Sequence, residues 1–317
     1  ALYAEDVASG ERTLIAENDK ADIGGTIRDR ETGEVQAYSV NYLKTEWTAL
    51  DADLGASLEW LGTQLDGEYG ISSRTDDNQT WIVWNDPLTA PTATFIFDRS
   101  TQTLTPFYVT RPELEGAPLQ PMHPVEITAR DGLTLPCYLT LPAGTGMDGD
   151  GKPERPSPMV LLVHGGPWAR DDYGFASGVQ WLANRGYAVL QVNFRGSTGF
   201  GKSFVNAGDL EWGLKMHDDL IDAVDWAIAQ GITQTDTVAI MGGSYGGYAV
   251  NAVLANYPGH FIAGVSLFGV ADWVTALEIA SPALQASDRI EYGDIREQKW
   301  VDYYTENSPL RLADQIK

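Results

Sequence analysis

Hydrophobic and polar positions change their pattern near residue 120. Before it, short runs of β-branched and aromatic residues are separated by turn residues. After it, continuous apolar runs alternate with stretches whose apolar residues recur every three to four positions. The first pattern is typical of hairpin-linked antiparallel strands, and the second of a parallel sheet covered by helices. The sequence therefore predicts an all-β domain over residues 1–122 and an α/β domain over residues 123–317.

Three stretches of the first domain look alike. They read DVASGERTL from Asp6, DRETGEVQA from Asp29 and DRSTQTLTP from Asp98. Each places an Asp-led turn between strand residues, which predicts a hairpin. Their spacing indicates two propeller blades of roughly 40–50 residues each and part of another, with a β-sandwich as the alternative. Fewer than three blades cannot close a ring, so a propeller would need earlier blades.

A proline-rich stretch separates the two patterns. Residues 111–124, RPELEGAPLQPMHP, have no periodicity and predict a linker. Beyond it, VEITAR and LTLPCYLTLP predict a hairpin. Further strands are predicted at MVLLVHG, YAVLQVNF, TVAIMGG and FIAGVSLFGV, and helices at FASGVQWLANRG, MHDDLIDAVDWAIAQG and YGGYAVNAVLAN. Strands that alternate with helices imply a mostly parallel sheet covered on both faces.

Composition limits the partners. The 317 residues are 43% hydrophobic and 21% charged, as in a globular protein with room for two cores. The formal net charge of −23 disfavours nucleic acids and anionic membranes, and no apolar run is long enough to predict a transmembrane helix. The first residues lack an initiator Met and a signal-peptide pattern and start within strand-like sequence. We expect the chain to begin in mid-domain, which leaves the compartment open.

Two features that suggest chemistry are better explained by structure. Cys137, the single cysteine, lies in the apolar pattern LTLPCYLTL and is expected to be a buried thiol. The loop MDGDGKPE, residues 147–154, faintly resembles a calcium loop but lacks its acidic twelfth position and flanking helices. We expect a solvated hairpin turn there, and neither a metal ion nor a cofactor in the protein.

The stretch VAIMGGSYGGYAV, residues 238–250, carries the strongest candidate for catalysis. Gly242, Ser244 and Gly246 match G-x-S-x-G, the nucleophile elbow, in which a strand turns sharply into a helix. Ser244 must then take a strained backbone conformation at the tip of the turn, where its hydroxyl is clear of the sheet. The apolar strand before it and the apolar helix after it make Ser244 the candidate nucleophile.

An oxyanion hole is expected beside Ser244. The elbow directs the N–H of Tyr245 and the positive end of the helix at the place where an oxyanion would form. The second donor is expected in the loop VHGGPW, where we assign the N–H of Gly166, with Gly165 as the alternative. His164 precedes the nucleophile, whereas the expected order is Ser, acid, His. We therefore expect His164 to shape the loop.

A family resemblance rests on five stretches of the second domain: HGGP, NFRGSTGFGKSF, DDLIDAVDWA, GGSYGGYA and SPLRLADQIK. They resemble the prolyl oligopeptidase family of serine peptidases, most of all its acylaminoacyl-peptidase and dipeptidyl-peptidase branch. The resemblance implies an α/β-hydrolase fold, an N-terminal propeller that admits only short peptides, and a Ser-Asp-His triad. By motif match, Ser244 is the nucleophile, the N–H groups of Tyr245 and Gly166 form the oxyanion hole, and Arg195 and Gly196 have a structural role.

The base of the triad is not evident in the sequence. The histidines are His123, His164, His217 and His260, and only His260 follows Ser244. It comes after the helix that leaves the elbow, and a helix of about twelve residues spans roughly 18 Å. His260 is therefore expected as a polar loop residue at the opposite end of the sheet, beyond the reach of a base.

The position of the triad acid is not evident in the sequence either. Asp272, in FGVADW, follows a strand at the correct end of the sheet, but the resembled family carries its acid after the next strand. We expect the triad Asp and His to lie beyond Lys317, so residues 1–317 alone are expected to be inactive and their last apolar strand exposed. The expected partners are short peptide substrates, a second copy of the protein, or a second chain that carries the missing segment.

Two other functions stay open. A serine esterase would share the fold, but it would not need a propeller-like filter. A non-catalytic propeller and hydrolase-like binding protein is the third candidate, and the intact elbow and HGGP loop argue against it. Dipeptidyl, acylaminoacyl and endopeptidase specificities are not distinguished. Tyr248, Trp168 and Phe175 are candidates for either the substrate pocket or the core.

Overall fold

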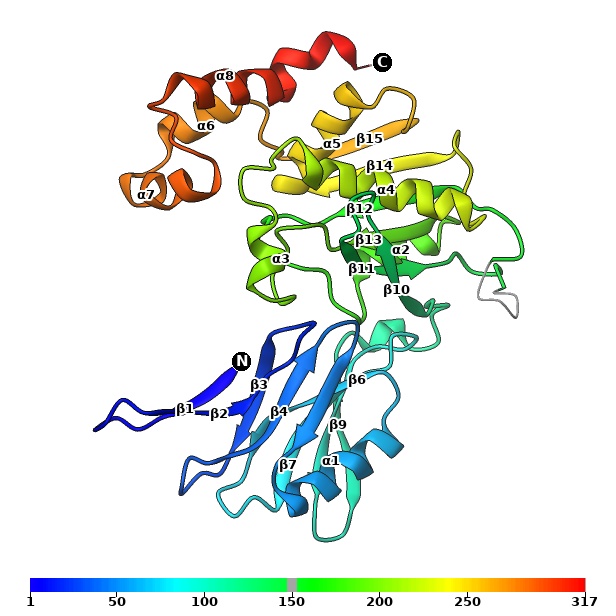
Figure 1. Cartoon of the computed structure of the whole chain (residues 1–317). Helices are drawn as coiled ribbons and strands as arrows, with labels where there is room; N and C mark the ends of the chain where they lie inside the picture. The colour runs from blue at the N-terminus through cyan, green and yellow to red at the C-terminus, as the bar shows by residue number, and fades with distance from the viewer. Residues whose placement is uncertain (147–152, 317) are drawn as a thin grey trace. The chain divides into compact units, whose positions relative to one another are not determined.

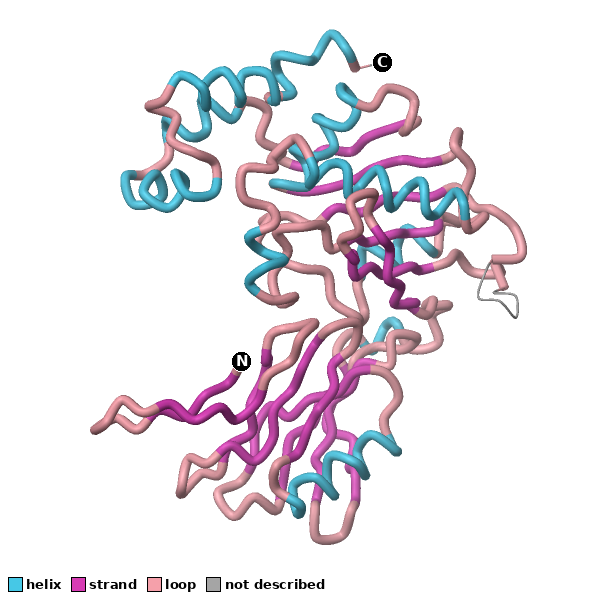
Figure 2. The backbone as a smooth tube through the Cα atoms, viewed as in Figure 1, coloured by secondary structure: helices cyan, strands magenta, loops and turns pink. Residues whose placement is uncertain are grey.

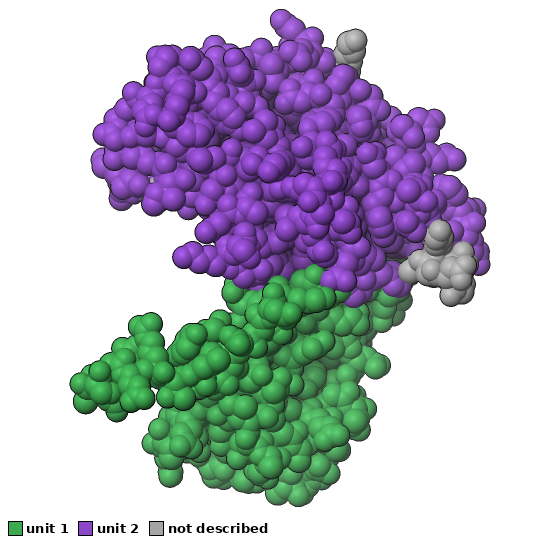
Figure 3. All heavy atoms as spheres, in the orientation of Figure 1, with its two compact units in different colours: residues 1–122, 172–180 green, residues 123–171, 181–317 purple. Residues whose placement is uncertain are grey.

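The computed structural model describes residues 1–146 and 153–316. They form two compact units, the first of residues 1–122 and 172–180 and the second of residues 123–171 and 181–317, coloured separately in Figure 3. Residues 172–180 belong to the first unit although the chain on both sides of them belongs to the second. The sequence pattern did not predict that residues 172–180 belong to the first unit. The loop of residues 147–154 faintly resembles a calcium loop in sequence. Most of it, residues 147–152, lies outside the described residues.

Antiparallel strands make up most of the first unit (Figure 1). They form a two-stranded, a three-stranded and a four-stranded sheet, each in chain order. The strands are β1 (Leu2–Glu5), β2 (Arg12–Ala16), β3 (Ile23–Arg28), β4 (Val35–Asn41), β5 (Thr45–Ala49), β6 (Glu68–Arg74), β7 (Thr80–Asp86), β8 (Ala93–Asp98) and β9 (Thr103–Val109). The hairpins predicted after Asp6, Asp29 and Asp98 are confirmed as β1–β2, β3–β4 and β8–β9.

The same hydrogen-bond pattern closes all three of these hairpins. In the first, the Asp6 carboxylate accepts from the N–H groups of Ala8 and Ser9 at 3.0 and 2.7 Å. The carboxylates of Asp29 and Asp98 likewise each accept from the N–H groups of the residues two and three positions later in the chain. Hydrogen bonds within each turn lower the pKa of all three carboxyls. Each turn is thus held by its own residues.

A helix in the first unit contradicts the expectation of strands alone. It is α1 (Ala52–Gln64), and the Asp51 carboxylate caps it by accepting from the N–H of Leu54 at 2.7 Å. Leu54, Leu58 and Leu61 are buried in a core that also contains Trp81 and Phe97. The spacing of these leucines is that of one helical face, a signal that the hairpin repeats obscured.

One six-stranded sheet forms the centre of the second unit, in the order β10-β11-β13-β12-β14-β15. Its strands are β10 (Met122–Thr128), β11 (Thr134–Thr140), β12 (Met159–Val163), β13 (Ala188–Val192), β14 (Val238–Gly243) and β15 (Ala263–Leu267). Parallel pairing joins β13 to β12, β12 to β14 and β14 to β15, whereas β11 pairs antiparallel with β13. The predicted strands are therefore confirmed, and β10 shows that the last residues of the predicted linker are already strand.

Helices connect the parallel strands, as Figure 2 shows in cyan. The connecting helices are α2 (Ser177–Ala183), α3 (Lys202–Asn206), α4 (Lys215–Ala229) and α5 (Tyr245–Asn256). After the last strand, β15, come α6 (Trp273–Ile279), α7 (Pro282–Glu291) and α8 (Gln298–Asn307). Short 3₁₀ turns are η1 (Pro112–Leu114), before β10, and η2 (Pro309–Gln315), after α8. The three predicted helices are confirmed as α2, α4 and α5. α4 and α5 turn buried faces toward the core.

Burial decreases from the middle of the sheet toward β15. Every residue of β13 is buried, which shows that helices and loops cover both faces there. Cys137 on β11 is fully buried and free, as predicted, and burial raises the pKa of its thiol. All five residues of β15 are exposed, and Phe268 directly after it is 87% exposed. The apolar edge expected at this strand is therefore present.

Candidate active site

Ser244 lies at the junction between β14 and α5. Its backbone has φ 56° and ψ −117°, which a residue with a side chain adopts only at a cost that its surroundings must offset. Two hydrogen bonds hold it: the N–H of Ser244 donates to Leu267 O at 2.9 Å, and the N–H of Tyr248 donates to Ser244 O at 3.0 Å. Ser244 is exposed whereas Tyr245 and Gly246 are buried. The strained, exposed serine predicted from the sequence is thus found at this turn.

The glycines of the elbow are required by close packing. A β-carbon on Gly246 would lie 2.2 Å from Val163 O, and one on Gly242 would lie 2.6 Å from the carbonyl carbon of Gly246. Both distances are shorter than any tolerable contact. The end of β12 therefore presses directly on the first turn of α5, and this contact sets how sharply the chain bends at Ser244.

The loop after β12 packs against the elbow. A β-carbon on Gly165 would lie 3.0 Å from Gly243 O and 3.4 Å from the Ser244 Cβ. Gly166 has φ 119°, a conformation that side chains rarely adopt, and it precedes Pro167. The structure thus brings the loop with both candidate donors next to Ser244, at the end of the sheet where the positive end of α5 also lies.

His164 is held on both ring nitrogens within this loop. Its Nδ1 lies 2.7 Å from Gly165 O and its Nε2 lies 3.0 Å from the Ser197 hydroxyl. The imidazole also stacks on Phe194, with ring centroids 4.5 Å apart. These contacts fit the expected loop-shaping role and leave neither nitrogen directed at Ser244.

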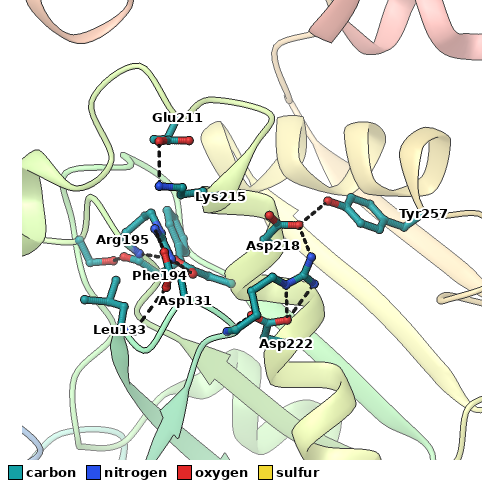
Figure 4. Close-up of polar contacts among 12 residues, drawn as sticks. Asp131, Leu133, Phe194, Arg195, Glu211, Lys215, Asp218, Asp222 and Tyr257 are labelled. Atoms are coloured by element: carbon teal, nitrogen blue, oxygen red, sulfur yellow. Dashed lines mark hydrogen bonds and ion pairs between the residues drawn. The ribbon is translucent and has the colours of Figure 1, made fainter.

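The buried side chain of Arg195 forms ion pairs with two carboxylates, the buried Asp219 and the exposed Asp131, of which Asp131 is labelled in Figure 4. Its guanidinium donates to both oxygens of Asp219, at 2.9 and 2.6 Å, and to Asp131 at 2.8 Å. Its own N–H also donates to Asp219. Hydrogen bonding to Arg195 lowers the pKa of Asp131 to about 2, whereas burial raises the pKa of Asp219 despite the same partner. The sequence placed Arg195 and Gly196 in a structural role, but it gave no signal for Asp131 or Asp219.

His260 and His217 lie away from Ser244. His260 is in the loop between α5 and β15, where its N–H donates to Tyr257 O. Because β14 and β15 are parallel, this loop is at the opposite end of the sheet from Ser244. His217 is fully buried on α4 beside Tyr248, and burial lowers its pKa to about 4. Among the described residues, neither of these side chains is placed to act as the base for Ser244.

Asp272 has other partners. Its carboxylate caps α6 by accepting from the N–H of Thr275 at 3.0 Å, and it forms an ion pair with Arg311 at 3.0 Å. Both contacts are typical of a structural side chain at a helix start. They account for Asp272 without a place in a triad.

Aromatic side chains gather around Tyr245. Trp212 contacts Tyr245 at 4.9 Å and Trp273 at 4.9 Å between ring centroids, and Tyr292 contacts Trp212 at 4.2 Å. Tyr248, one of the pocket candidates, is fully buried among them. Trp168 contacts Trp212 and is 38% exposed, whereas Phe175 belongs to the first unit. The sequence did not predict this cluster, because its members come from segments that are far apart in the chain.

Within residues 1–146 and 153–316, no group of three or more His, Cys, Asp or Glu side chains is placed to bind a metal ion. No helix within residues 1–146 or 153–316 combines the length and the apolar character that a membrane span needs.

A strained serine between a parallel strand and a helix, beside a glycine loop, is the arrangement typical of the nucleophile elbow in α/β hydrolases. The sequence model described as "Prolyl oligopeptidase family" matches residues 173–317. Residues 173–317 therefore belong to the prolyl oligopeptidase family. It is 53% identical to dipeptidyl aminopeptidase BIII of Pseudoxanthomonas mexicana, over 100% of this chain and 46% of that protein. It is 36% identical to dipeptidyl peptidase family member 6 of Caenorhabditis elegans, over 94% of this chain and 43% of that protein.

Solved structures show the same fold. The chain matches a Mycobacterium tuberculosis puromycin-hydrolyzing peptidase with a TM-score of 0.76 and 20% identity, over 99% of this chain and 48% of that one. It matches the Pyrococcus horikoshii acylaminoacyl peptidase with a TM-score of 0.70 and 21% identity, over 94% of this chain and 45% of that one. The chain thus spans just under half the length of each of these relatives.

Proposed function

We propose that the protein containing these residues is a serine peptidase that releases small amino-terminal units from short peptides, of the dipeptidyl or acylaminoacyl type. The observation that carries the proposal is the exposed Ser244 at φ 56° between β14 and α5. Family membership and the names of the relatives, which include dipeptidyl and acylamino-acid-releasing peptidases, support the substrate class.

In the proposed reaction the Ser244 oxygen attacks the scissile carbonyl carbon and transfers its proton to a base. The carbonyl oxygen becomes an oxyanion, which accepts from the N–H groups of Tyr245 and Gly166 near the positive end of α5. The amine leaves with a proton from the base, and water then releases the acyl group from Ser244 by the reverse sequence of proton transfers.

The base and its acid are proposed to lie outside residues 1–317. His164 is held by Gly165 and Ser197, His260 lies at the other end of the sheet, and Asp272 caps α6. Residues 1–317 alone should then have no peptidase activity, because a serine hydroxyl is a weak nucleophile without a base. Adding the missing residues, on the same chain or on a second one, should restore activity.

The first unit is proposed to be part of a propeller that limits access to short peptides. Its four-stranded antiparallel sheet β6–β9 has the form of one blade, and β3–β5 supplies three strands of another. Asp6 and Asp98 lie 92 residues apart, about the length of two blades of roughly 40–50 residues each.

The test uses the full-length protein with Ser244→Ala. Covalent labelling by a fluorophosphonate should disappear, and turnover of dipeptidyl and acylaminoacyl anilides should fall by roughly 10⁶-fold. Ser9→Ala, in an exposed turn of the first unit, is the matched control and should label normally. Normal labelling of the Ser244→Ala variant would overturn the assignment.

A further inference from the structure

A cavity of about 210 Å³ lies within the first unit, where β9 ends. Segments that are far apart in the chain line it, and all of them fall within residues 1–122 or 172–180. At about 30 Å³ for each water molecule, the cavity has room for roughly seven waters, which suits a small organic group better than a long peptide. Its lining includes Thr92, Thr110, Arg111, Leu114, Phe175 and Ser177.

Arg111 supplies the positive charge of this cavity. Its guanidinium lies 5.8 Å from the centre of the Phe175 ring, within the range of a cation–π contact. In the part of the chain that the structure describes, this guanidinium has no carboxylate or hydrogen-bond partner. Arg12, Arg30 and Arg99 of the same unit each form an ion pair with Asp or Glu. Arg111 is therefore free to pair with an anion from outside the chain.

The backbone of Arg111 is strained. Its φ of 61° and ψ of 61° are left-handed, and its side chain makes no capping hydrogen bond to η1. Glycine adopts this conformation freely, whereas a residue with a β-carbon adopts it at a cost in stability. A glycine would make the same turn without that cost, so the turn alone does not explain the arginine. Strain of this kind is typical of sites where the side chain has a function.

Hydroxyl groups add to the polar side of the cavity. They belong to Thr92, Thr110 and Ser177, and none of the three has a hydrogen-bond partner among the described residues. The N–H of Thr110 donates to Thr92 O at 2.8 Å, which holds these two residues side by side. The N–H of Phe175 donates to the Asp86 carboxylate at 2.6 Å, which fixes the segment with the ring. The guanidinium and the hydroxyls thus supply donors for the oxygens of an anion.

The apolar side of the cavity decides between anions. Phe175 and Leu114 are half-buried there. Inorganic phosphate would bring up to two negative charges to one cation in a protein of net charge −23, and it has no apolar part to cover the ring. A carboxylate beside an apolar side chain has one charge for the guanidinium and apolar surface for Phe175.

We propose that this cavity binds a carboxylate that neighbours an apolar side chain, either the carboxyl end of a peptide or a free acylated amino acid. Arg111 pairs with the carboxylate, the hydroxyls donate to its oxygens, and Phe175 contacts the apolar group. The site goes beyond the proposed peptidase reaction, since it lies in the first unit and binding there does not require Ser244.

The test measures binding directly, in the full-length Ser244→Ala protein, so that no turnover is needed. N-acetylleucine, titrated by ligand-observed NMR, should bind with a Kd on the order of 1 mM, as expected for a ligand of this size. N-acetylleucine amide keeps the apolar side chain but lacks the charge. It should bind at least about tenfold more weakly, because hydrogen bonds to a charged group are lost.

Variants of Arg111 in this background separate binding from folding. Arg111→Gln should weaken N-acetylleucine binding at least about tenfold. Arg111→Lys keeps the charge without the planar fork and should be intermediate. Arg111→Gly should lose binding as Arg111→Gln does, yet raise the melting temperature, because the backbone strain is released. The matched control is Arg28→Gln, the same change at an exposed position on β3, which should not affect binding.

The source of the carboxylate is decided with active protein. The comparison is kcat/KM for a tripeptide that ends in leucine, as the free acid and as the amide. If the ligand is the end of the substrate, the ratio of acid to amide should fall in Arg111→Gln. If the ligand is a separate small molecule, the ratio should stay the same.

Four results would overturn the proposal: equal affinities for N-acetylleucine and its amide, unchanged affinity in Arg111→Gln, no binding at tens of millimolar, or tighter binding of inorganic phosphate than of N-acetylleucine. The last of these would assign the cavity to a different anion. Failure to bind together with normal fluorophosphonate labelling of Ser244 refutes this site alone. Normal labelling of Ser244→Ala would instead refute the proposed function.

Discussion

Two kinds of turn, one in each unit, place residues in left-handed backbone conformations for different reasons. In the hairpins of the first unit, an Asp carboxylate holds the turn, and the residue four positions later has positive φ: Gly10 at 73°, Gly33 at 75° and Gln102 at 50°. Nothing lies within 4 Å of a β-carbon built on Gly10 or Gly33. At the elbow of the second unit, Ser244 has φ 56° and is held by contacts from β12 and β15.

This difference shows which parts of the molecule are locally encoded. A hairpin turn carries its own hydrogen bonds and needs no partner from elsewhere in the chain. At the elbow, one local hydrogen bond runs from the N–H of Tyr248 to Ser244 O, but the other contacts that offset the strain come from strands that are distant in sequence.

Adding a methyl group to a glycine should separate the two kinds of turn. Gly246→Ala places a β-carbon 2.2 Å from Val163 O, so the free energy of unfolding should fall by at least about 3 kcal/mol. Gly10→Ala meets open space and bears only the cost of its positive φ, about 1 kcal/mol. Urea denaturation followed by circular dichroism measures both. Equal losses would show that the elbow is no more dependent on tertiary packing than the hairpin.

Acid should affect the two units in different pH ranges. His217 in the second unit has a folded pKa of about 4 against an ordinary value of 6.5, so the unfolded chain binds its proton first. Stability from this residue is complete above pH 6.5 and is lost as pH falls toward 4, by up to about 3 kcal/mol. The turn carboxyls of the first unit have lowered pKa values, so their contribution is lost only below their ordinary value of 3.8.

The measurement is urea unfolding between pH 7 and pH 4. His217→Leu should remove most of the decline in stability over this range, whereas His260→Phe, which changes a loop histidine, should leave it intact. A decline of wild-type size in His217→Leu would show that another group titrates there.

The smallest effect concerns the third hairpin turn. Gln102 occupies with φ 50° the place that glycine takes in the other two turns. Gln102→Gly should therefore stabilise the first unit by up to about 1 kcal/mol, because the strain of a side chain at positive φ is removed. The control is Gln79→Gly in the β6–β7 loop, because Gln79 does not have a positive φ. This change should not stabilise the first unit. A lower melting temperature of Gln102→Gly would show that the glutamine side chain contributes contacts of its own.

Much of this protein was determined by the sequence alone. The Asp-led turns identified three hairpins, because each turn contains its own hydrogen-bond donors and acceptors. Continuous apolar runs identified the parallel strands, since a strand buried on both faces has few polar positions. The G-x-S-x-G pattern in its strand–helix setting predicted the strained conformation of Ser244. The α1 helix was missed, although Leu54, Leu58 and Leu61 carried its signal.

Only the tertiary structure decided the rest, because those features join segments that local patterns cannot relate. Residues 172–180 belong to the first unit, and the ring stack of His164, Phe194 and Tyr245 unites three segments that follow different strands. Arg195 meets Asp131 and Asp219 across 64 and 24 residues of sequence. Such contacts depend on the order of strands in the sheet, which no periodicity of hydrophobic residues encodes. The backbone strain at Ser244 was readable in the sequence, but the packing that sustains it was not.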